Sequence, residues 1–151
     1  MNDVINEQIK QMYAKAFYDI IDETINSDKP DYDWIVSLYT EIKERIIKYI
    51  RKDCKVYKQI DDDFDIKLFK QMIEYDVFNY ESLLKLINNT FYWIKHLQAP
   101  IRDEMTEEAK QRILNSQPEK MVSTFIKEVN TCLDILDEDL INYIKKEKDV
   151  L

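Results

Sequence analysis

The complete absence of glycine from this chain restricts its fold more than any other sequence feature. Tight turns between antiparallel strands normally use glycine. The phosphate-binding loops of nucleotide- and dinucleotide-binding folds require it. Both kinds of structure are therefore effectively excluded, and the most economical fold for the chain is all-α.

The composition is that of an acidic globular protein. Hydrophobic residues make up 45% and charged residues 34% of the 151 positions, which suits a single helical domain over 1–151. The formal net charge of −8 disfavours generic attraction to nucleic acid or to an anionic membrane. No apolar run approaches the ~18 residues of a membrane span, and the N-terminus lacks the features of a signal peptide. We therefore expect a cytoplasmic protein with no membrane association, in which Cys54 and Cys132 are free thiols.

Hydrophobic spacing predicts a bundle of about five to seven helices. An aromatic helix over 80–98 is apolar around much of its circumference, and we expect it at the centre of the bundle. A long final helix covers 118–147, and a first helix over 3–26 carries an apolar face. The other predicted helices cover 66–77, 103–114 and a segment that runs from residue 31 or 33 into a basic stretch at 45–58.

Short polar side chains lie where these helices should begin and end. Asp31 or Asp33 is suited to cap the second helix, and Asn79 is suited to cap the aromatic helix. The first helix should stop within 26–30, which ends in a proline. We expect Asn26 to take the left-handed conformation there that glycine usually supplies.

No arrangement of residues in the sequence points to catalysis or metal binding. The acidic run 61–65 lacks the glycine of a calcium-binding EF-hand loop, and the residues that follow it return to a helical pattern. Asp63 or Asp65 is instead predicted to cap the helix that follows. His96 is the single histidine, and no second histidine or thiol lies at metal-ligand spacing. We therefore predict that the protein is not an enzyme and uses no metal or cofactor.

A basic patch follows the second predicted helix and has two interpretations. Four of its positions keep helical spacing, so they would form a stripe. In the first interpretation, these cations complement the helix C-terminus and pair with the acidic run 61–65. In the second, they bind an acidic partner or nucleic-acid phosphates. The residues of the patch are Arg45, Lys48, Arg51, Lys52 and Lys55, and the basic stretch continues to Lys58.

Four segments of the chain carry a family resemblance. Residues 98–104 read Gln-Ala-Pro-Ile-Arg-Asp-Glu and match a Cys-Ala-Pro-Val/Met-Arg-Asp-Glu pattern. Segments 41–44, 64–71 and 133–143 match three further patterns in the right order. Over residues 31–144 the chain resembles the T-complex protein 11 family, and it is identified as a shortened member because typical members continue through a further helical region. Gln98 stands where the family has cysteine, so no thiol-based role is expected at that position.

The resemblance implies a non-enzymatic helical protein that serves as an interaction or scaffold module. Members are associated with cAMP-dependent kinase signalling, which implies protein partners whose identity is unknown. The alternative is a structural or nucleic-acid-associated component that uses the basic stretch from Arg45 to Lys58. The long final helix would pack either within the chain or across a dimer, so a homo-oligomer is also open. The motif residues carried over from the family are Ala99, Pro100, Arg102, Asp103, Glu104, Asp139 and Asn142.

These motif residues also have two interpretations. In the structural one, Pro100 ends the aromatic helix, Asp139 supplies a carboxylate to Arg102, and Asp103 caps the short helix that follows. An unpaired charge close to buried helices would be costly, which favours that ion pair. In the functional one, Arg102, Asp103 and Glu104 form an exposed corner that binds a partner.

Overall fold

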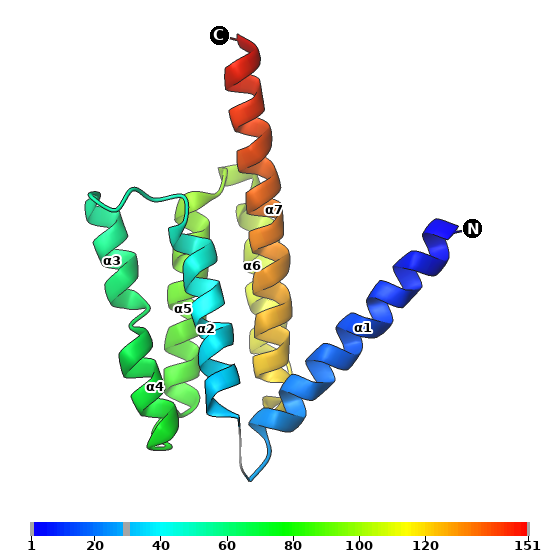
Figure 1. Ribbon diagram of the computed structural model, residues 1–151, viewed down its shortest axis with the longest axis vertical. Helices are drawn as coiled ribbons and strands as arrows, with labels where there is room; N and C mark the ends of the chain where they lie inside the picture. Colours follow the sequence, from blue (N-terminus) through cyan, green and yellow to red (C-terminus); the bar gives the residue numbers. More distant parts are fainter. Residues whose placement is uncertain (1, 29–30, 151) are drawn as a thin grey trace.

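The computed structural model describes residues 2–28 and 31–150, and within these ranges the fold is all-α (Figure 1). Seven α-helices and two short 3₁₀-helices account for the regular structure of the described residues, which confirms the predicted class. In chain order they are α1 (Asn2–Ile25), α2 (Tyr32–Ile47), α3 (Lys55–Asp63), α4 (Ile66–Glu74), α5 (Tyr80–Leu97), η1 (Pro100–Arg102), α6 (Asp103–Leu114), η2 (Pro118–Lys120) and α7 (Met121–Val150).

Three of the predicted helix caps are confirmed. The Asp31 carboxylate accepts a hydrogen bond from the backbone N–H of Trp34, and Asp65 accepts one from Leu68. Asn79 forms a reciprocal capping box with Ser82 at the start of α5. Each cap satisfies a backbone donor that has no partner within the helix, so the local sequence fixes these three starts.

The end of α4 shows how the chain makes a tight turn without glycine. Asp76 has a φ of 54°, in the left-handed region. The backbone N–H of Val77 donates to the carbonyl of Met72, and that of Asp76 donates to Ile73. This is the Schellman arrangement, in which the left-handed position is usually glycine. Aspartate tolerates that conformation better than most residues, so it takes the role that glycine would have.

The end of α1 differs from the prediction for Asn26. Among the described residues, Asp76 is the one with a positive φ, so Asn26 is not in the left-handed conformation. The Asn26 side-chain amide instead donates to the carbonyl of Asp22, at 2.7 Å, and to that of Glu119, at 3.2 Å. These bonds close α1 and tie it to η2. Positions 29 and 30 of the predicted break lie outside the described residues.

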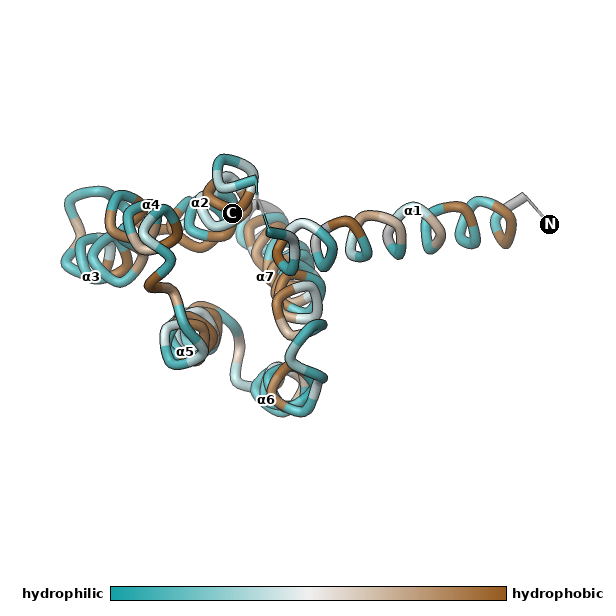
Figure 2. Tube along the Cα trace, turned by 90° about the horizontal axis from the view of Figure 1, so that it is seen from below, coloured by the Kyte–Doolittle hydropathy of each residue, from teal (hydrophilic) through white to brown (hydrophobic). Residues whose placement is uncertain are grey.

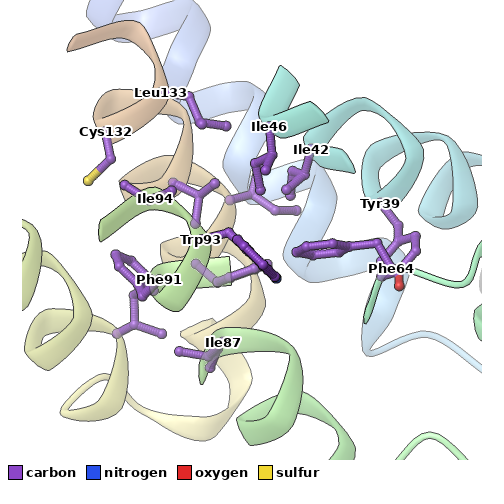
Figure 3. Close-up of a cluster of buried hydrophobic side chains, with 14 of the residues drawn as sticks. Tyr39, Ile42, Ile46, Phe64, Ile87, Phe91, Trp93, Ile94, Cys132 and Leu133 are labelled. Atoms are coloured by element: carbon purple, nitrogen blue, oxygen red, sulfur yellow. The ribbon is translucent and has the colours of Figure 1, made fainter. Parts of the chain in front are cut away.

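The core is formed between α2, α5, α6 and α7, with α3 and α4 closing one side (Figures 1 and 3). On α5, Ile87, Phe91 and Ile94 point inward, as the aromatic-helix pattern predicts. Tyr80 and Tyr92 of the same helix are more than half exposed, so α5 also has a solvent side. The helix α7 contacts α1, α2, α5 and α6, which makes it the element on which most of the bundle packs.

The segment between α2 and α4 corrects the predicted secondary structure. The helix α2 ends at Ile47, residues 48–54 form turns, and a separate helix α3 covers Lys55–Asp63. The buried residues Ile60 and Phe64, with Val56 one turn earlier, hold α3 against the core. Their spacing of four residues was the signal for this helix, but the surrounding charges obscured it. The acidic run 61–65 is therefore partly helical and is not a continuous loop.

The first helix lies largely clear of the bundle. In both views α1 projects away from the other helices, and apolar positions recur along its length (Figures 1 and 2). Among the side chains of α1 that the structure describes, Tyr18 and Ile25 in its C-terminal part are half-buried against the core. The predicted apolar face exists, but Ile5, Ile9 and Met12 on it are exposed. No helix among the described residues is long and apolar enough to span a membrane.

Candidate functional site

The motif at 98–104 forms the corner between α5 and α6. Ala99 has an extended backbone, with φ −68° and ψ 145°, as expected for a residue before proline. Pro100 then opens the 3₁₀-helix η1, and α6 starts at Asp103. The proline therefore ends the aromatic helix, as predicted, and turns the chain within a few residues.

The corner is joined to α7 by a bidentate ion pair. Arg102 Nε lies 2.9 Å from Asp139 Oδ2, and Arg102 Nη2 lies 3.0 Å from Asp139 Oδ1. This confirms the ion pair predicted between these two residues. Hydrogen bonds from Arg102 lower the pKa of the Asp139 carboxyl below its ordinary value. The two side chains are 40% and 31% exposed, so the pair lies near the surface and is only partly buried.

Gln98 fixes the inner side of the same corner. Its Nε2 donates to Asp103 Oδ1 at 3.0 Å, and its Oε1 accepts from the Thr106 hydroxyl at 2.7 Å. Thr106 is buried, so its hydroxyl needs such a partner. The predicted capping role of Asp103 is wrong, because this carboxylate binds Gln98 and α6 has no side-chain cap. In the sequence, Gln98 stands out only because it replaces the cysteine of the family pattern, and the signal for its role is its amide, which can both donate and accept.

The outward side of the corner is apolar. Ala99, Pro100 and Ile101 are consecutive and exposed, and Ile101 is 86% exposed. Glu104 lies beside them at the start of α6 and is also exposed. We call these four residues the corner face. The remaining motif residue, Asn142, is exposed on α7. The motif thus divides into residues that hold the corner and residues that it presents to solvent.

A second polar cluster joins α2 to α7 around Asp137. Arg45 Nη2 lies 2.7 Å from Asp134 Oδ1 and 3.0 Å from Asp137 Oδ2, and Lys48 Nζ lies 3.1 Å from Asp137 Oδ1. The Tyr49 hydroxyl also donates to Asp137. Partial burial alone would raise the pKa of the Asp137 carboxyl, but the hydrogen bonds from Tyr49, Arg45 and Lys48 outweigh it and lower this pKa.

The basic patch is therefore not a helical stripe. Arg45 is on α2, whereas Lys48, Arg51 and Lys52 lie in or next to the turns that follow, and Lys55 starts α3. The predicted pairing with the acidic run 61–65 is wrong for Arg45 and Lys48, because both bind carboxylates of α7. Arg51 pairs with its neighbour Asp53 at 2.8 Å. These ion pairs neutralise much of the charge that a nucleic-acid surface would need.

Two of the hollows between the helices are less open to solvent than the others, and both are small. One, of about 200 Å³, includes Asp63, Phe69 and Lys85 in its lining, and the other, of about 110 Å³, is lined by apolar side chains such as Ile35 and Phe125. Pockets for metabolites typically measure ~300–1,000 Å³. Among the described residues, no group of three or more His, Cys, Asp and Glu could hold a metal ion. The corner is thus a better-defined candidate site than either hollow.

These features define an all-helical bundle whose candidate site is a surface corner held to its C-terminal helix. The chain belongs to the T-complex protein 11 family, since the family model described as T-complex protein 11 matches residues 2–144. The match begins well before the predicted start at residue 31 and includes α1. The human T-complex protein 11 homolog is 27% identical over 101 residues, which cover 66% of this chain and 20% of that protein. The chain thus aligns with about a fifth of that relative's length, and no solved structure matches it.

Proposed function

We propose that this protein is a non-enzymatic interaction module of the cytoplasm, and that the corner face is the surface through which it recognises a protein partner. The observation that supports this is the exposure of three consecutive apolar residues, Ala99, Pro100 and Ile101, on a segment that hydrogen bonds hold in place. Single exposed apolar residues are normal on protein surfaces. Three in succession are unfavourable unless they have a role.

The support beneath the corner face favours binding. Arg102, Gln98 and Thr106 hold the backbone from inside through hydrogen bonds to α7 and α6. A rigid surface loses little conformational entropy when it binds, which favours recognition by a small number of residues. Ile101 would supply the apolar contact and Glu104 a charged contact at its edge. We extend the proposal to partners in cAMP-dependent kinase signalling, the process with which the family is associated.

The proposal can be tested by site-specific photo-crosslinking. A photoreactive amino acid replaces Ile101 in one sample and Leu68 in the other, where Leu68 is an exposed apolar residue on α4. Both proteins are irradiated in a lysate of the native host, and the products are identified by mass spectrometry. We expect at least one protein that crosslinks from position 101 and not from position 68. Its binding to the purified chain should then be lost in Ile101→Asp and kept in Leu68→Asp.

Two results would contradict the proposal. One is a set of crosslinked proteins that is the same for both positions. The other is a purified partner that binds Ile101→Asp as well as it binds the wild type. The signalling extension has its own arm, in which purified regulatory and catalytic subunits of cAMP-dependent kinase replace the lysate. No crosslink to either subunit would remove that extension and leave the corner-face proposal standing.

A further inference from the structure

One side of α1 carries a continuous row of exposed apolar side chains, which we call the α1 stripe. Met12 and Tyr13 at its middle are 72% and 75% exposed, and Ile9 is 45% exposed. Exposed apolar patches above ~300–600 Å² are unusual on monomeric proteins and mark interaction surfaces. The residues of the α1 stripe are Ile5, Ile9, Met12, Tyr13, Ala16 and Ile20.

The α1 stripe faces away from the bundle to which α1 belongs. Among the side chains of α1 that the structure describes, the half-buried ones are Tyr18, Asp22, Thr24 and Ile25. At about 3.6 residues per turn, Tyr18 and Ile25 project from the side opposite the α1 stripe. Swinging α1 onto α7 would therefore not bury the α1 stripe unless the helix also turned about its axis. Contact from another molecule covers the stripe without such a rotation.

We propose that the α1 stripe is a dimerisation surface, and that it pairs antiparallel with the α1 stripe of a second copy of this chain. A two-fold symmetric interface must be complementary to itself. In an antiparallel pair centred between Met12 and Tyr13, Ile5 of one copy lies opposite Ile20 of the other, and Ile9 lies opposite Ala16. Each stripe residue thus meets another stripe residue, and the small Ala16 leaves room for the larger Ile9.

The size of the surface agrees with a specific dimer. From their exposed fractions, the stripe side chains offer on the order of 600 Å², compared with the ~800 Å² per partner of a standard interface. The aliphatic parts of flanking side chains such as Gln8 and Lys15 supply further area. In both views α1 projects from the bundle, so antiparallel pairing places the two bundles at opposite ends of the helix pair (Figures 1 and 2).

The charges along α1 are compatible with the pairing. Lys15 and Asp19 flank the α1 stripe and form an ion pair of 3.5 Å within the helix. Glu23 continues the line of the stripe beyond Ile20 and is exposed. In the antiparallel arrangement it meets the N-terminal end of the partner's α1, where the helix dipole is positive. The stripe residues themselves carry no charge, so the pairing brings no like charges together within the two stripes.

The first test is the oligomeric state of two matched variants. Met12→Glu introduces a charge into the α1 stripe, whereas Gln11→Glu introduces the same charge one residue away, on another side of the helix. Sedimentation velocity from roughly 1 to 100 µM spans the affinities expected for an interface of this size. We expect the wild type and Gln11→Glu to dimerise and Met12→Glu to do so at least roughly tenfold more weakly. Circular dichroism checks that both variants are folded, as the exposure of both positions leads us to expect.

The second test is the orientation of the two helices. A spin label is attached to the cysteine of an Asp3→Cys variant in a Cys54→Ser background, and it reports the distance between the two copies. The buried Cys132 should stay unlabelled. Antiparallel pairing predicts a label separation on the order of 30 Å, and parallel pairing one on the order of 10 Å. The shorter distance would overturn the proposed pairing. A wild type that stays monomeric would overturn the dimer, and the α1 stripe would then be a surface for a different protein. A Met12→Glu variant that dimerises as well as the wild type would show that the stripe is not the interface.

Discussion

Arg102 and Asp139 lie 37 residues apart in the sequence, and two parallel hydrogen bonds of 2.9 and 3.0 Å join them. Such bidentate pairs between arginine and a carboxylate are geometrically demanding and fix the relative orientation of the segments that carry them. The pair therefore holds the corner at 98–104 in a defined position against α7. Because both side chains remain partly exposed, its main contribution is geometry, and we expect only a modest contribution to stability.

Substitution of Arg102 should show the modest contribution of the pair to stability. We expect Arg102→Ala and Arg102→Lys both to lower the melting temperature slightly. Alanine removes the ion pair, and lysine keeps the charge but cannot form the bidentate hydrogen bonds. The measurement is thermal unfolding followed by circular dichroism. Arg51→Ala is the matched control, because the Arg51–Asp53 pair is exposed and joins near neighbours. An Arg102→Ala variant that melts at the wild-type temperature would show that the pair does not support the fold.

Removal of the Asp137 charge should be more destabilising than the equivalent change at Asp134. Asp137 is 24% exposed and accepts bonds from Arg45, Lys48 and Tyr49, whereas Asp134 is 73% exposed. We expect Asp137→Asn to lower the free energy of unfolding by about 1–2 kcal/mol. Asp134→Asn should change it by less than about 0.5 kcal/mol. Urea unfolding of the two variants measures the difference, and equal losses would contradict the assignment of Asp137 as the centre of the cluster.

The stability of the protein should fall in acid through Asp137 and Asp139. Hydrogen bonds lower the folded-state pKa of both carboxyls below the ordinary value of 3.8. The unfolded chain therefore binds protons more readily, so this part of the stability is present above about pH 4 and is lost as the pH falls through the folded-state values. Urea midpoints measured from roughly pH 6 to pH 2 should show the decline. Asp139→Asn should flatten it, and a curve parallel to that of the wild type would count against the mechanism.

The left-handed turn at Asp76 predicts a stabilising substitution. Asp76→Gly removes the steric penalty of a φ of 54° but adds entropy to the unfolded chain. We expect a net gain of about 0.5–1 kcal/mol in the free energy of unfolding. Glu74→Gly, two residues earlier within α4, should instead lose about 1 kcal/mol. If both variants lose stability equally in urea unfolding, the backbone at Asp76 is not strained.

The sequence by itself determined the class of the fold, most helix boundaries and the cap at Asn79. It narrowed two further caps to two neighbouring aspartates each, of which the structure uses Asp31 and Asp65. These features depend on contacts within one or two turns, such as the bond from Trp34 to Asp31 at 3.1 Å. Hydrophobic spacing and short polar side chains encode such contacts directly. The Arg102–Asp139 pair was also predictable, because both residues belong to motifs that the family resemblance brought together.

Only the tertiary structure decided which side chains meet across the bundle and which faces stay open. Arg45 binds Asp137 over a separation of 92 residues, and no local pattern distinguishes that carboxylate from the nearer acidic run. The apolar spacing of α1 predicts an amphipathic helix but does not say whether its own bundle covers it. Burial depends on the direction in which the preceding and following segments place a helix, and that direction is set by contacts such as the one between Asn26 and Glu119. The exposed α1 stripe is therefore a property of the assembled chain.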